Sequence, residues 1–145
     1  MIGIGIRTSN QNFMQEVPPL WQRFNMENLA EQIPNRLDRD ILVLYTDYED
    51  NYTKPFTYII GCRVANLRQI PTEMMSKAVP AADYAVYTAK GKMPDCMIQT
   101  WQQIWLADSE LERTYLYDFE IYGEKSRDRD NTEIEVYLGT HKAKV

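Results

Sequence analysis

The chain has 145 residues, a length that suits one domain with one sizeable core. Hydrophobic residues make up 44% and charged residues 26%, an ordinary globular composition, and no segment approaches the roughly 20 consecutive apolar residues of a membrane helix. The formal net charge is −5, and the sequence has no long run of lysine or arginine, so we do not expect the basic surface of a nucleic-acid-binding protein.

The first half of the chain predicts a strand, a helical segment and two further strands. Alternating apolar residues favour the strands, and apolar residues at helical spacing favour the helix. Pro18 and Pro19 interrupt the helical pattern, which predicts two helical pieces or a kink. The expected elements are a strand over residues 2–8, the helical segment over 11–33, and strands over 41–48 and 56–67.

The second half predicts the same order again. Its expected elements are a strand over residues 84–89, a helix over 95–108, and strands over 115–123 and 132–140. We therefore predict one domain, 1–145, built from two βαββ repeats at about 1–69 and 70–145. Each repeat would be a small sheet with a helix on one face. Two repeats side by side would leave the other sheet faces free to form a groove for a small molecule.

The start of the chain lacks a signal-peptide pattern, and its two cysteines, Cys62 and Cys96, are isolated and have no metal-ligand spacing. We expect a cytoplasmic protein with free thiols and no zinc site. The single histidine, His141, is expected on the surface, so neither a histidine-based catalytic triad nor a haem site is predicted.

Seven segments, in this order and spacing, resemble the GyrI-like domains, also called AraC-type effector-binding domains. They are LWQRF, YTDYE, YIIGCRV, VPAADYAVYTAKG, TWQQIWL, YDFEIY and IEVYLG, and together they span nearly the whole chain. The resemblance implies an α+β fold of tandem βαββ repeats, of the GyrI-like or SHS2 type, around a pseudo-twofold central ligand cavity. It also implies a stand-alone effector-binding or sequestration module, as found in mobile gene cassettes, because the two repeats leave no room for a helix-turn-helix.

Glu120 is the candidate charge anchor. It lies between Phe119 and Ile121 and alternates onto a strand face with Leu116 and Tyr122. The strand alone leaves open whether that face meets water or a pocket. The resemblance favours the pocket, because it aligns Glu120 with the acidic residue of the family's cavity. A carboxylate among aromatic rings is poorly solvated, so its pKa should rise or it should pair with a cation.

Four aromatic residues are predicted to join Glu120 in the ligand-binding site: Tyr45, Trp101, Tyr137 and Trp21. Strand alternation favours Tyr45. Tyr137 is included because it lies opposite the apolar face of the last strand. The two tryptophans can equally be core residues between helix and sheet. Aromatic faces would add cation–π attraction for a lipophilic cation.

We therefore expect reversible binding of hydrophobic, positively charged, drug-like molecules, without a cofactor and without direct contact to nucleic acid or membrane. Two alternatives stay open. One is a hydrolase that uses Glu120 as acid or base on an electrophilic small molecule. The other is a protein-interaction or inhibitor module. A homodimer is also left open.

Overall fold

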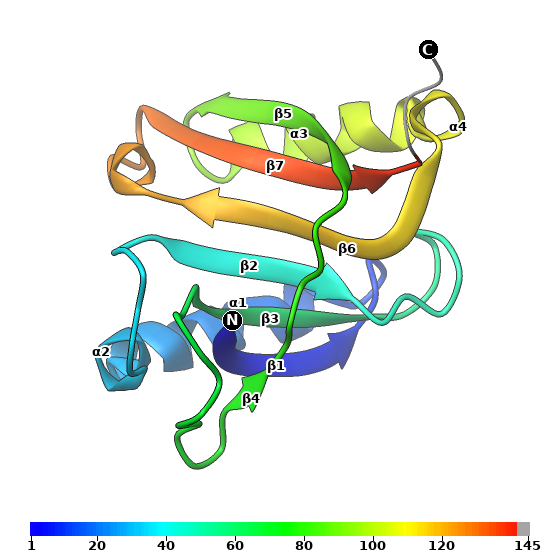
Figure 1. Ribbon diagram of the computed structural model, residues 1–145. Coiled ribbons are helices and arrows are strands. Elements are labelled where there is room, and N and C mark those ends of the chain that lie inside the picture. Colours follow the sequence, from blue (N-terminus) through cyan, green and yellow to red (C-terminus); the bar gives the residue numbers. More distant parts are fainter. Residues whose placement is uncertain (142–145) are drawn as a thin grey trace.

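The computed structural model describes residues 1–141, in which seven strands form one antiparallel sheet of order β4-β1-β3-β2-β6-β7-β5 (Figure 1). The strands are β1 (Ile2–Thr8), β2 (Ile41–Thr46), β3 (Phe56–Cys62), β4 (Met75–Ser76), β5 (Asp83–Gly91), β6 (Arg113–Tyr122) and β7 (Thr132–Thr140). The helices are α1 (Phe13–Met26), α2 (Leu29–Gln32), α3 (Asp95–Leu106), α4 (Asp108–Leu111) and the 3-10 turn η1 (Glu124–Ser126).

The sheet consists of two βαββ repeats joined edge to edge. The first contains β1, α1, β2 and β3, and the second contains β5, α3, β6 and β7. In each repeat the last strand pairs between the other two, and β2 pairs with β6 to join the halves. The predicted tandem βαββ fold is confirmed. The short β4 follows residue 70 but pairs with β1, so the boundary between the repeats stays a prediction.

Both long helices lie on the same face of the sheet, behind it in Figure 1. α1 covers the first half with Val17, Leu20 and Phe24, and α3 covers the second half with residues that include Met97 and Ile104. The segment between β4 and β5 crosses the opposite face, where Val79 packs on a separate apolar cluster. The prediction that Glu120 lies on the sheet face away from the helices is wrong, because Glu120 contacts Trp101 of α3.

The helix α1 runs through Pro18 and Pro19 without ending. Each proline removes one N–H, which leaves the carbonyls of Met14 and Gln15, four residues earlier, without a helical partner. All four residues are exposed, and Met14 is 69% exposed, so water can hydrate these carbonyls. The prolines therefore do not divide the helix.

Candidate functional site

Glu120 lies at the centre of the sheet, between Val43 on β2 and Val136 on β7, and is only 1% exposed. Its carboxylate accepts three hydrogen bonds from aromatic side chains. The Tyr45 hydroxyl and Trp101 Nε1 donate to Oε2 at 2.9 and 2.8 Å. The Tyr122 hydroxyl donates to Oε1 at 2.8 Å. Of the predicted site residues, the structure thus brings Glu120, Tyr45 and Trp101 into direct contact.

No cation pairs with Glu120 among residues 1–141. Burial raises the pKa of Glu120, and the hydrogen bonds from Trp101, Tyr122 and Tyr45 oppose that rise because they stabilise the carboxylate. Burial, with the nearby carboxylate, also holds the pKa values of Tyr45 and Tyr122 well above the ordinary range. The site is therefore a buried acid surrounded by neutral donors.

Glutamine in place of Glu120 is expected to stabilise the protein near neutral pH. Because the folded pKa is raised, the folded state binds a proton more tightly than the unfolded state. Stability is therefore lost as pH rises from the ordinary glutamate pKa through the raised one, by about 1.4 kcal/mol for each pH unit between the two values. The variant lacks this loss, so its Tm should exceed that of the wild type by about 2–4 °C for each kcal/mol of unfolding free energy that the wild type loses. Thermal unfolding at pH 5 and pH 8 checks this, and an advantage no larger at pH 8 contradicts it.

The rings around Glu120 pack directly against one another. The Tyr45 ring lies 5.1 Å from the ring of Trp101 and 5.1 Å from that of Tyr58. On the other side, Trp21 lies 5.1 Å from Tyr122 and donates from Nε1 to the Tyr58 hydroxyl at 2.8 Å. Trp21 and Trp101 come from the helices of the two repeats, and of the two only Trp101 donates a hydrogen bond to the acid.

A cavity of about 710 Å³ opens beside this cluster. Trp21 and Tyr122 line its inner side, and α2, the chain before β2 and the β6–β7 connection line the rest. Its lining residues are Trp21, Asn25, Ala30, Glu31, Arg36, Arg39, Ile41, Tyr122, Gly123, Ser126, Arg127 and Arg129. Tyr122 both lines this cavity and donates to Glu120, so its side chain separates the open space from the buried acid.

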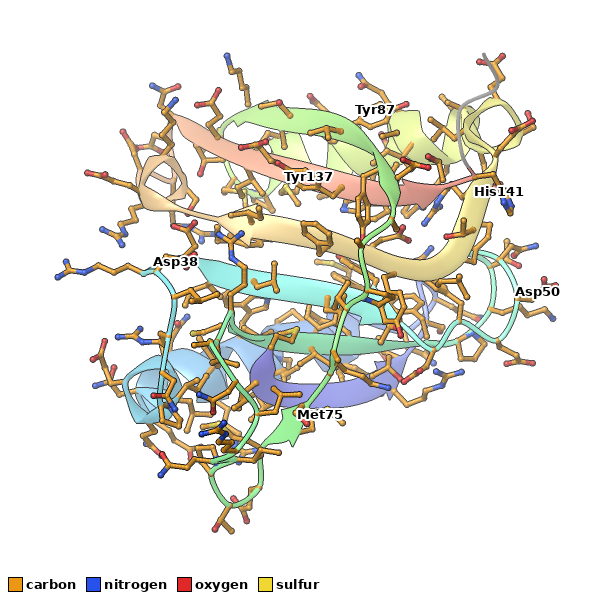
Figure 2. The ribbon with its side chains drawn as sticks, in the orientation of Figure 1. Asp38, Asp50, Met75, Tyr87, Tyr137 and His141 are labelled. Carbon is orange, nitrogen blue, oxygen red and sulfur yellow. The ribbon has the colours of Figure 1, made fainter. Side chains whose placement is uncertain are left out.

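Tyr137 does not join the cluster, contrary to the sequence prediction. Its ring stacks 4.7 Å from Phe119 on the sheet face away from the helices (Figure 2). Its hydroxyl donates to Glu135. The apolar residues that alternate with Tyr137 on β7 belong to the core under the helices, and one of them, Val136, pairs with Glu120, so Tyr137 necessarily points the other way.

Tyr122 and Tyr58 belong to the cluster but are absent from the predicted site residues. Tyr122 follows Glu120 by two positions, so strand alternation already places it on the same face. Tyr58 pairs with Tyr45 across β2 and β3, a register that no single-strand pattern reveals.

A second buried acid lies on the same strand. Asp118 accepts hydrogen bonds from Arg113 at 2.7 Å, from the Tyr48 hydroxyl at 2.6 Å and from the Gly139 amide at 2.8 Å. Unlike Glu120, this carboxylate already has a protein cation. In residues 1–141, no group of three or more histidine, cysteine or acidic residues is arranged to hold a metal ion, and no helix is long and apolar enough to span a membrane.

The tandem βαββ sheet, with a ring-enclosed acid and an adjacent cavity, is the architecture of an effector-binding domain. The chain belongs to the family of Cass2, the integron-associated effector binding protein, whose family model matches residues 1–139.

Three proteins are similar to this one over nearly the whole length of the chain. YobU of Bacillus subtilis (strain 168), which its name assigns provisionally to the transcriptional regulators, is 27% identical over 145 residues, covering 97% of this chain and 91% of YobU. The integron cassette protein VCH_CASS2 from the mobile metagenome of Vibrio cholerae is 26% identical, with a TM-score of 0.76 over 97% of this chain and 88% of that structure. SAV2435, solved with tetraphenylphosphonium bound, is 17% identical, with a TM-score of 0.76 over 97% of this chain and 87% of its own. This last likeness concerns the fold.

Proposed function

We propose that this protein reversibly binds hydrophobic, positively charged small molecules and that Glu120 is the charge anchor. The observation that carries the proposal is a carboxylate that is 1% exposed, hydrogen-bonded by three neutral aromatic donors, and without a cation among residues 1–141. A buried anion without a counter-charge is costly, and a lipophilic cation removes that cost without bringing much water with it.

The surrounding side chains suit such a ligand. Tyr45, Trp101 and Tyr122 present π faces and edges around the acid, and a desolvated cation gains about 2 kcal/mol from a well-placed ring. An aromatic wall also adapts to ligands of different outline, because apolar contact is not directional. The tetraphenylphosphonium ion bound by the structurally similar SAV2435 is a molecule of this class.

Entry to the site requires movement of Tyr122. The open cavity ends at Trp21 and Tyr122, and the Tyr122 hydroxyl holds Glu120 from that side. Rotation of the Tyr122 ring would break one hydrogen bond to the acid and join the cavity to it. The ligand's positive charge would then replace the donated proton as the partner of Oε1.

A calorimetric titration with tetraphenylphosphonium tests the proposal. Glu120→Gln keeps the shape of the side chain and removes its charge, and we expect it to weaken binding tenfold or more, about 1.4 kcal/mol. Glu135→Gln is the matched control, because it removes the same charge from an exposed position of the neighbouring strand.

Equal affinity of wild type and Glu120→Gln would show that Glu120 does not anchor the ligand. An equal loss in Glu135→Gln would show that net charge, rather than the site, governs binding. No binding by the wild type would reject this class of ligand.

A further inference from the structure

The cavity beside Glu120 is lined by positive charge, although the protein as a whole is acidic. Its four arginines, here called the arginine rim, are Arg36, Arg39, Arg127 and Arg129. The one acidic residue in the lining is Glu31, which pairs with Arg36 at 3.6 Å. Against a net charge of −5, the rim is a local reversal of sign.

Three guanidinium groups of the rim have no carboxylate partner in the described part of the chain. Arg39, Arg127 and Arg129 form no ion pair there. The two acids that flank Arg39, Asp38 and Asp40, both pair with Arg63. In the β6–β7 connection, the Asp128 carboxylate accepts a backbone N–H from Asp130.

This arrangement is unfavourable for a simple cation on its way to Glu120. Like charges at the cavity would repel it, whereas guanidinium groups bind oxyanions through paired N–H donors. Glu120, by contrast, lies behind Tyr122 and favours a positive group. The two charges are thus separated along one path, with the arginine rim outside and the acid inside.

Building on the proposed function, we propose that the natural ligand is zwitterionic. Its positive, aromatic part reaches Glu120 past Trp21 once the Tyr122 ring has rotated, and a carboxylate or other oxyanion remains in the cavity against the arginine rim. The ligand class is therefore an amphiphile with charges of opposite sign at its two ends, held in one orientation. A cation without the oxyanion would make the contacts around Glu120 but none with the arginine rim.

Two dyes that differ in one group test this inference. Tetramethylrhodamine carries a xanthene cation and a free carboxylate, and its methyl ester carries the same cation without the carboxylate. Binding is followed by fluorescence anisotropy, and chromatography after each titration verifies that the ester is intact. The variants are Arg127→Gln/Arg129→Gln and the charge-matched control Lys54→Gln/Arg68→Gln, whose residues do not line the cavity.

We expect the wild type to bind the zwitterion more tightly than the ester. The rim variant should bind the zwitterion about fivefold to tenfold more weakly than the wild type does, as expected for the loss of two exposed charge contacts. Its affinity for the ester should be unchanged or higher. The control variant should bind both dyes with the affinity of the wild type.

Two results would overturn the inference, and they are distinguishable. If both dyes bind and Glu120→Gln weakens both, but the rim variant affects them equally, the inference fails and the proposed function stands. If the wild type binds neither dye, the inference fails, and the tetraphenylphosphonium titration decides separately on the proposed function.

Discussion

Methionine in place of Arg113 is expected to lower the free energy of unfolding by about 3–5 kcal/mol, the usual cost of removing one partner from a buried ion pair. The Arg113 side chain is 1% exposed and that of Asp118 is 0% exposed. Methionine fills much of the same volume, so the loss comes mainly from leaving the Asp118 carboxylate buried without its cation. Urea unfolding followed by tryptophan fluorescence measures it.

The double variant Arg113→Met/Asp118→Asn separates charge from packing. Without the uncompensated carboxylate, it should recover part of the lost stability. Together with Asp118→Asn alone and the wild type, the variants form a double-mutant cycle. A loss below about 1 kcal/mol in Arg113→Met would contradict the prediction, because it would mean that the pair does not compensate a buried charge. All these variants leave Glu120 and its three donors in place.

Cation affinity is expected to fall steeply with acidification. Burial raises the pKa of Glu120, so protonation competes with the ligand at a higher pH than for an exposed glutamate. Above the raised pKa the affinity should be constant, and below it the affinity should fall, by at most tenfold per pH unit, until it reaches that of the uncharged site in Glu120→Gln. Tetraphenylphosphonium is a suitable probe because its own charge does not titrate.

Calorimetric titrations from pH 5 to pH 8 on wild type and Glu120→Gln test this dependence. The variant has no titrating group at the anchor and should bind weakly with a nearly flat pH profile. The phenols of Tyr45 and Tyr122 do not contribute in this range, because burial raises their pKa values well above it. A profile with the same slope in both proteins would assign the titration to another group.

The repeated order of strands and helices is predictable because apolar residues recur at strand or helix spacing within each element, and residues that disfavour regular structure separate the elements. The position of Glu120 inside the protein is not predictable from its strand alone. Both faces of β6 carry aromatic residues, and alternation separates two faces without saying which one meets the helices. The resemblance to effector-binding domains favours a pocket over water around Glu120, but the predicted groove is on the sheet face away from the helices, which is not the face where Glu120 lies.

The same ambiguity explains the error at Tyr137. The sequence prediction separates the apolar residues Ile134, Val136 and Leu138 from Glu120, whereas all three belong to the helix-covered core and Val136 pairs with Glu120. The arginine rim is not predictable either, since its members come from chain segments about ninety residues apart that only the fold brings to one cavity.

The pairing of β2 with β6, where the repeats join, leaves room for only one buried carboxylate at the position of Glu120. In the antiparallel pairing of β2 with β6, Val43 lies directly opposite Glu120, and each also pairs with an apolar residue of the next strand, Ile60 or Val136. Val43 and Glu120 thus occupy the same place in the two halves, at the axis of the internal duplication. Acids in both places would put two carboxylates side by side in an apolar interior, where one would remain protonated. Divergence at this single position makes a nearly symmetric protein electrostatically asymmetric. Under the proposed function, this asymmetry predicts one bound cation per chain.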